Sequence, residues 1–128
     1  MQGGAALPPR PILFISLGFV QEVNDMALKA AFVFLAPAVD PDKHQATVVT
    51  PEVELTSVAV RDYAQAEEIA RALVANGVTA IELCGGFGHA GAARIAAAVA
   101  GKAAVGVVRF DNHPGLGGKS GDELFGNN

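Results

Sequence analysis

The residue types that could do chemistry gather in two glycine-rich segments of the sequence. Residues 84–91 have the sequence CGGFGHAG, and residues 109–122 have the sequence RFDNHPGLGGKSGD. Glycines between a strand and a helix let an anion approach the unpaired backbone N–H groups at the helix start. Histidine, arginine and lysine in the same segments add positive charge and groups that transfer protons. We therefore expect a ligand site where these two segments meet.

Each residue of the predicted site has an expected role. The backbone of residues 85–88 would bind the anion, and Arg109 and Lys119 would neutralise it. Asp111 would fix the tautomer of His113, because side chains two residues apart in an extended chain project to one side. The catalytic candidates are Asp111 and His113, and the ligand-binding candidates are Gly85, Gly86, Phe87, Gly88, His89, Arg109, Lys119 and Ser120.

Two nucleotide-binding motifs are present only in part. Residues 86–91 have the G-x-G-x-x-G spacing, and Asp111 follows about 20 residues later, where dinucleotide-binding proteins place a ribose ligand. That fold also needs a second mononucleotide-binding half, which is missing. Residues 113–120 imitate a phosphate-binding loop with His113 in place of the first glycine, but without the following helix and acidic strand. We expect a smaller anion, or glycines that serve only a tight turn.

Metal binding and nucleophilic catalysis are alternatives. His89, Asp111 and His113 are residue types that hold a divalent metal, although we assign no metal ligands and no cofactor. Alternatively, His89 only caps the glycine turn and His113 packs beside Pro114. Cys84 is either a nucleophile activated at a helix start or a small buried side chain.

Composition limits the class of protein. The 128 residues are 51% hydrophobic, which is enough for the core of one domain. Aromatic residues are only 6% and tryptophan is absent, which suits helices packed closely on a sheet. The net charge of −4 and the lack of a lysine and arginine cluster argue against nucleic-acid binding. A single cysteine excludes an intrachain disulfide and agrees with a cytoplasmic location.

The elements that position the site follow from hydrophobic periodicity. Four short apolar runs have the composition of strands, namely residues 28–36, 53–60, 78–83 and 103–110. Two longer segments have apolar residues at helical spacing and end near a glycine, namely residues 63–76 and 89–100. Asp62 is the predicted N-cap of the first of these helices. A further short helix is expected from Asp40, since Pro41 suits the first helical position.

Alternation of strands and helices predicts an α/β fold. We expect one small domain with a four-stranded, mainly parallel sheet flanked by helices, in the order β-α-β-α-β-α-β. Because the carboxyl ends of parallel strands share one edge, both glycine-rich segments should lie there. Glu82 would need a partner in a strand covered on both faces, and Arg109 is the candidate. The exposed sheet edges favour a homo-oligomer.

The first residues differ from the rest. Residues 1–25 contain three prolines near their start and a short apolar run at residues 12–20. That run is shorter than the roughly 20 residues that span a bilayer, so no membrane partner is expected. We expect residues 1–25 to be an N-terminal extension and residues 26–128 to form the single domain. The alternatives are an extra edge strand or an arm that packs on a partner.

Several sequence motifs together carry a resemblance that covers residues 26–125. They are KAAFVFLAP, TPEVELT, IELCGGFGHAG and VGVVRFDNHPGLGGKSGDELF. The chain resembles a family of small bacterial and archaeal proteins known only as a domain of unknown function. The resemblance implies no activity, substrate, cofactor or catalytic residue. It also implies that the residues before Met26 lie outside the shared domain.

These observations support three hypotheses about function. The first is that the protein binds a small metabolite bearing a phosphate or carboxylate at the carboxyl edge of the sheet. The second is a metal-dependent or acid–base enzyme that uses His89, Asp111 and His113. The third is a structural or regulatory homo-oligomeric subunit without catalysis.

Overall fold

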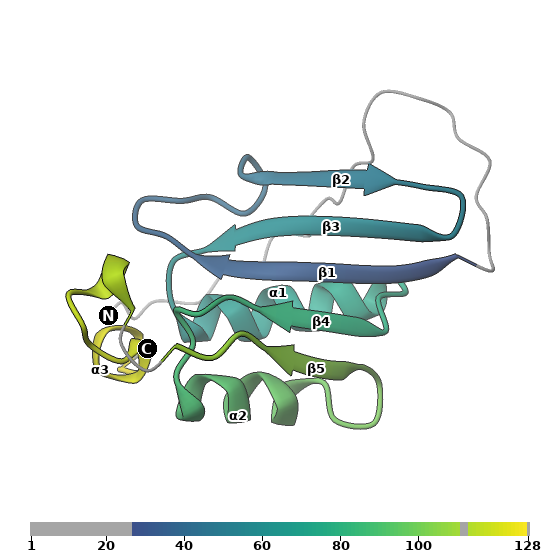
Figure 1. The fold of residues 1–128 in the computed structure, drawn as a ribbon. Coiled ribbons are helices and arrows are strands. Elements are labelled where there is room, and N and C mark those ends of the chain that lie inside the picture. The colour runs from purple at the N-terminus through teal and green to yellow at the C-terminus, as the bar shows by residue number, and fades with distance from the viewer. Residues whose placement is uncertain (1–26, 111–112, 128) are drawn as a thin grey trace, which may run out of the picture.

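The computed structural model describes residues 27–110 and 113–127. The predicted extension, residues 1–25, and the candidate Asp111 lie outside these residues. Figure 1 shows the elements in chain order. They are β1 (Leu28–Leu35), β2 (Gln45–Val49), β3 (Val53–Val60), α1 (Tyr63–Ala75), β4 (Ala80–Leu83), α2 (His89–Ala98), β5 (Ala104–Val107), the 3-10 helix η1 (Pro114–Leu116) and α3 (Gly121–Phe125).

The strands form one mixed sheet with the order β2-β3-β1-β4-β5. Strand β1 pairs in parallel with β3 and with β4, and β4 pairs in parallel with β5. The helices α1 and α2 make the crossovers from β3 to β4 and from β4 to β5. The prediction of an α/β domain with a mainly parallel sheet is confirmed.

The region after β1 differs from the prediction of four strands and a short helix. Asp40 begins a turn rather than a helix, in which its side chain accepts a hydrogen bond from the Asp42 N–H at 3.0 Å. The chain then forms β2, which pairs antiparallel with β3 and gives the sheet its fifth strand. The reason is that β-branched residues 47–49 favour extended backbone more than Pro41 favours a helix start. The Thr50 side chain closes the hairpin by bonding the Val53 backbone N–H at 2.9 Å.

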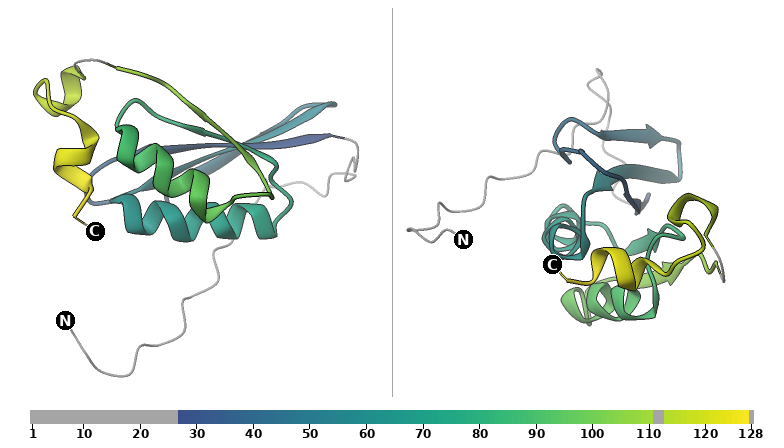
Figure 2. Two further views of the ribbon diagram at one scale, coloured as in Figure 1. Left: turned by 90° about the horizontal axis from the view of Figure 1, so that it is seen from below. Right: turned by 90° about the vertical axis from the view of Figure 1, so that its left-hand side faces the viewer.

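The two long helices cover only one face of the sheet. Figure 2 shows α1 and α2 side by side on that face. The core residues there include Val33, Val58, Ile69, Leu73, Leu83 and Ile95, all fully buried. Phe32 and Phe34 lie on the opposite face, where their rings stack with centroids 6.3 Å apart and no described helix covers them. Glu82 is exposed on that face, so the expectation that it needs a buried partner is wrong.

Helix α1 is built from local signals. Asp62 has extended backbone and accepts a hydrogen bond from the Gln65 N–H at 2.8 Å, as predicted for its N-cap. The Gln65 side chain in turn accepts a hydrogen bond from the Arg61 N–H at 2.9 Å. Gly77 follows the helix with a φ of +95°, the left-handed conformation that favours glycine after a helix. The sequence therefore determines both ends of α1.

The carboxyl ends of the four parallel strands lie at one edge of the sheet. Figure 1 shows η1 and α3 beside that edge, close to the amino end of α2. The segment that contains η1 and α3 therefore packs where the first glycine-rich turn leaves β4. The fold thus brings the two glycine-rich segments together.

Candidate functional site

A pocket of about 200 Å³ lies where the two glycine-rich segments meet. One wall is the turn between β4 and α2, the second is the chain just after β5, and the third is the segment from η1 to α3. The lining residues are Gly85, Phe87, Gly88, His89, Arg109, Phe110, His113, Lys119, Ser120 and Gly121.

Every predicted site residue that the structure describes lines this pocket, except Gly86. Asp111 lies outside the described residues. Gly86 is buried within the turn, and its N–H donates to the Cys84 sulfur at 3.3 Å. Cys84 is partly buried and does not line the pocket, and its sulfur also accepts from the Leu35 N–H at 3.4 Å. The structure thus places the other candidates around one cavity, while their roles stay predictions.

Two glycines in the turn between β4 and α2 leave room for side chains from other elements. A Cβ atom at Gly88 would come within 2.5 Å of the Asp122 carboxyl group. A Cβ atom at Gly85 would overlap the ring of Phe110. Neither glycine has a positive φ, so the backbone conformation alone does not require them. They are needed because the segments that follow β5 pack directly on the turn.

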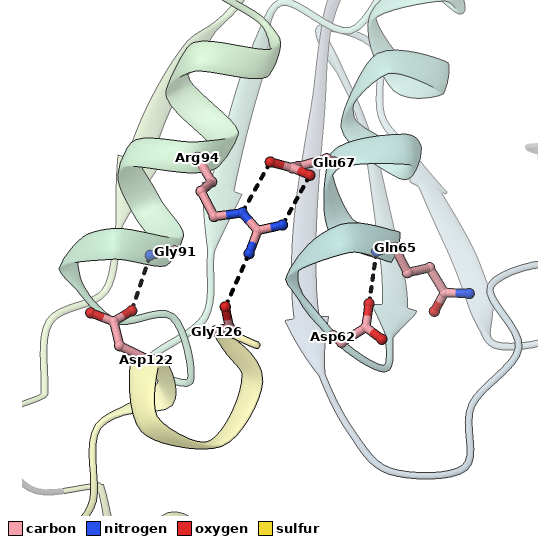
Figure 3. A network of polar contacts seen from close by, with 7 residues as sticks. All are labelled: Asp62, Gln65, Glu67, Gly91, Arg94, Asp122 and Gly126. Atoms are coloured by element: carbon pink, nitrogen blue, oxygen red, sulfur yellow. Dashed lines mark hydrogen bonds and ion pairs between the residues drawn. The ribbon is translucent and has the colours of Figure 1, made fainter. Parts of the chain in front are cut away.

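The amino end of α2 is capped by a residue from a distant part of the chain. The N-cap residue Gly88 has no side chain for this purpose. Instead, the Asp122 carboxylate accepts a hydrogen bond from the Ala90 N–H at 2.9 Å. It accepts a second one from the Gly91 N–H at 3.0 Å (Figure 3). The Tyr63 hydroxyl donates to the same carboxylate at 2.8 Å. An internal carboxylate therefore occupies the position where the sequence predicts an external anion.

The backbone of the turn offers fewer free donors than predicted. The Gly88 N–H donates to the Tyr63 hydroxyl at 2.9 Å. The N–H groups of Gly86 and Phe87 donate to the sulfur and to the carbonyl oxygen of Cys84. These three N–H groups already have partners within the chain. These three N–H groups are therefore not available to a ligand.

The charges around the pocket are positive. Arg109, Lys119 and two histidines line it, and no carboxylate does so among the described lining residues. Burial alone would raise the pKa of the nearby Asp122, but hydrogen bonds from the Ala90 N–H, the Tyr63 hydroxyl and the Gly91 N–H outweigh burial and lower it. Asp122 is therefore ionised at neutral pH, and its charge is directed at the positive end of the α2 dipole.

The comparison with protein families agrees with the resemblance seen in the sequence. The family described as "Family of unknown function (DUF6506)" matches residues 28–123. The chain belongs to this family. The DUF6506 match begins at the first residue of β1 and includes every lining residue of the pocket. Comparisons with curated proteins and with solved structures find no match.

His113 of this DUF6506 chain is held by its own backbone. Its Nδ1 atom accepts a hydrogen bond from the Gly115 N–H at 3.0 Å and so caps η1. Its ring lies against Phe110, with centroids 4.5 Å apart. A neutral His113 therefore carries its proton on Nε2. The Gly115 N–H therefore sets the tautomer on the Nδ1 side of the ring, and the predicted role of Asp111 stays a prediction.

Metal binding by the DUF6506 chain remains a prediction. Within residues 27–110 and 113–127, no group of three histidine, cysteine or acidic side chains is placed to hold a metal ion. The predicted set of His89, Asp111 and His113 includes a residue outside those ranges. In the same ranges, no helix is long and apolar enough to cross a membrane.

Two residues that shape the DUF6506 site were missed in the sequence. Tyr63 is fully buried and stacks on Phe87, with ring centroids 5.4 Å apart. Burial is the main reason that the pKa of Tyr63 is raised, so its hydroxyl stays protonated. Asp122 sits in a visible local capping motif, in which its N–H bonds the Ser120 hydroxyl at 3.1 Å. That motif predicts α3, but it does not reveal that the Asp122 side chain caps α2.

An ion pair between the two long helices was also missed. Arg94 of α2 forms two hydrogen bonds with Glu67 of α1, both at 3.1 Å (Figure 3). The Arg94 hydrogen bond is the main cause that lowers the pKa of Glu67. A third Arg94 nitrogen donates to the Gly126 carbonyl at 3.5 Å. The pair therefore ties α1, α2 and the residue after α3 together.

Proposed function

We propose that this protein binds a small anionic metabolite, bearing a phosphate or a carboxylate, in the pocket beside α2. The supporting observation is the convergence of Arg109, Lys119 and two histidines on one cavity in a chain of net charge −4. The cavity of about 200 Å³ is smaller than the roughly 300–1,000 Å³ of drug-sized sites. It suits a ligand of few atoms, or the anionic end of a larger one.

Side chains would supply the binding energy. Arg109 and Lys119 bring positive charge to the cavity, and both residue types bind phosphate and carboxylate. One Arg109 nitrogen also donates to the Phe110 carbonyl at 3.2 Å. The Ser120 hydroxyl accepts from the Asp122 N–H at 3.1 Å and keeps its own proton for a ligand. Phe87 and Phe110 give the cavity apolar walls. The ligand therefore meets a cation on the second and on the third wall, and an aromatic ring on the first and on the second.

Thermal unfolding tests this proposal. The protein is kept reduced, since we also propose a cytoplasmic location from its single cysteine. Phosphate, sulfate and short carboxylates are compared at constant ionic strength. A ligand at 100 times its Kd adds about 2.7 kcal/mol to stability, so Tm should rise clearly.

Variants separate a specific site from general charge attraction. Lys119→Ala and Arg109→Ala should each weaken binding about tenfold, the loss that corresponds to about 1.4 kcal/mol. Lys102→Ala is the control, because it removes the same charge from the exposed turn after α2. The proposal fails if no anion raises Tm in the wild type. It also fails if Lys102→Ala weakens binding as much as Lys119→Ala.

Acid–base catalysis at His113 is a second candidate. The fixed tautomer favours it, because a general acid needs its proton on a defined nitrogen. In this case the bound anion is a substrate, and His89 and Asp111 are the assisting groups. Each anion that binds is incubated with the protein and followed by NMR. Turnover that disappears in His113→Gln while binding persists supports catalysis, and unchanged anions argue for a binding protein.

A homo-oligomer is a third candidate, and we place its contact at β2. This edge strand has no charged residue and no proline, the usual features that prevent pairing of edges. Its Val48 is 62% exposed. Val48→Lys should therefore yield monomers in light scattering after gel filtration. The other edge strand, β5, also lacks charge and proline, so Val107→Lys tests that edge, and monomers from Val107→Lys alone would contradict a contact at β2. A wild-type protein that is monomeric at high concentration excludes this candidate.

A further inference from the structure

The third wall of the pocket belongs to a segment with little stability of its own. Lys119, Ser120 and Gly121 line the pocket just before or at the start of α3, which has five residues. An isolated helix of this length does not persist in water, since formation of the first turn is unfavourable. Leu124 of α3 is 46% exposed, so of its two large apolar side chains only Phe125 packs against the core. Contacts with the rest of the molecule must hold the wall in place.

Asp122 provides the strongest of these contacts. Its carboxylate accepts three hydrogen bonds, two from the first turn of α2 and one from the buried Tyr63. The Tyr63 hydroxyl in turn accepts from the Gly88 N–H at 2.9 Å. One carboxylate therefore connects α3, α1 and the turn that forms the opposite wall of the pocket.

The surfaces around this connection fit closely. A Cβ atom at Gly121 would overlap the Gly86 carbonyl oxygen, and a Cβ at Gly88 would lie 2.6 Å from the Ser120 hydroxyl oxygen. Phe125 packs on the ring of Tyr63, with centroids 6.2 Å apart. The segment can therefore dock in only one position, and that position sets the distance between the Lys119 wall and the Gly88 wall.

We infer that Asp122 is a positioning residue of the pocket, and that anion binding and docking of residues 119–126 stabilise each other. The inference rests on the proposed function, since it concerns the same pocket. An anion that contacts Lys119 on one wall and His89 or Arg109 on the others binds only when both walls are in place. By linkage, the ligand must then favour the docked segment as much as the docked segment favours the ligand.

Asp122→Asn is the variant that tests this coupling. The amide keeps the size of the carboxylate but loses its charge and turns an N–H₂ group toward backbone N–H donors. Glu123→Gln is the matched control, because it removes one negative charge from an exposed neighbour on the same helix. The glutamine side-chain oxygen can still accept the hydrogen bond that Glu123 accepts from the Ser120 N–H. If Asp122→Asn does not fold, Tyr63→Phe removes one of the three donors while it keeps the ring.

Two measurements are made on each variant with inorganic phosphate as the probe. Hydrogen exchange reports docking of residues 119–126 and capping of Ala90 and Gly91, and calorimetry reports phosphate affinity. Phosphate should slow exchange of the segment in the wild type. Asp122→Asn should accelerate that exchange and weaken phosphate binding about tenfold, if the docked fraction falls to about one tenth. Glu123→Gln should change affinity by less than about twofold.

The outcomes separate the two proposals. If the segment exchanges faster in Asp122→Asn but phosphate affinity is unchanged, the coupling is wrong and the binding function stands. If exchange of the segment is the same in Asp122→Asn and in the wild type, Asp122 does not position the wall. If the wild type binds phosphate but phosphate leaves exchange of residues 119–126 unchanged, the coupling is also overturned. If the wild type binds no anion, the proposed function fails, and with it the coupling.

Discussion

The amino ends of α1 and α2 are both capped by an aspartate, but from different distances (Figure 3). Asp62 is the residue directly before α1, and its side chain accepts a hydrogen bond from the Gln65 N–H, three residues away. Asp122 bonds the Ala90 and Gly91 N–H groups from 32 and 31 residues away. The first cap stabilises one helix. The second also fixes where a separate segment packs, so the same chemistry becomes part of the tertiary structure.

Removal of each cap should therefore have unequal effects. Asp122→Ala should lower the free energy of unfolding by about 3 kcal/mol, because three donors, among them the hydroxyl of the buried Tyr63, lose a charged acceptor at once. Urea unfolding followed by circular dichroism measures this loss. A loss no larger than that of Asp62→Ala would contradict the distinction between the two caps.

Substitution of Gly88, the glycine that leaves room for the Asp122 side chain, should destabilise the protein nearly as much. Gly88→Ala places a Cβ within 2.5 Å of the Asp122 carboxyl group, which should cost about 2 kcal/mol. Gly106→Ala in β5 is the control, since a Cβ there meets nothing within 4 Å. Urea unfolding of both variants gives the comparison. Equal stability of the two would show that the close approach at Gly88 is unimportant.

Loss of the Asp62 side chain, the cap of α1, should destabilise the protein less. Asp62→Ala should lower the free energy of unfolding by about 1 kcal/mol, the usual contribution of an N-cap side chain. It should leave hydrogen exchange of residues 119–126 unchanged, because none of those residues bonds Asp62 in the structure. Faster exchange in that segment would indicate that the two caps are coupled.

Acidification should have the smallest effect on stability, and it should act by protonating Asp122, the cap of α2. The pKa of Asp122 in the folded protein lies below its ordinary value of 3.8, so its contribution to stability is present above that pH and is lost as pH falls through the lower pKa. Tyr63 is the single tyrosine and tryptophan is absent, so intrinsic fluorescence reports on this contact. We expect a fluorescence change below pH 3.8 that Asp122→Asn lacks. The same change in both proteins would assign it to another group.

The contrast between the caps also explains which parts of the structure were predictable. Asp62 and Gly77 act on residues beside them, so the bounds of α1 followed from the sequence. The meeting of the two glycine-rich segments followed from the rule that parallel strands share a carboxyl edge. The role of Asp122 did not follow, because its partners are set by how the helices pack rather than by nearby residues.

The errors in the fold have related physical reasons. The turn at Asp40 and a helix start have the same preference for aspartate and proline, so only the pairing of β2 with β3 separates them. Phe32 and Phe34 gave β1 the continuous apolar sequence of a strand buried on both faces, although no helix in the described part of the chain covers one of them. Exposed apolar residues are common, which makes such a sequence compatible with either arrangement.

The spacing of the distant cap has a consequence for synthesis of the chain. The ribosome makes Gly91 31 residues before Asp122, so α2 emerges while its first turn has no carboxylate to meet. Newly made protein is therefore expected to fold β1 to α1 first and to complete the amino end of α2 only afterwards. Translational arrest before Asp122 should therefore leave nascent chains in which β1, β2 and β3 can pair but the third wall of the pocket is missing.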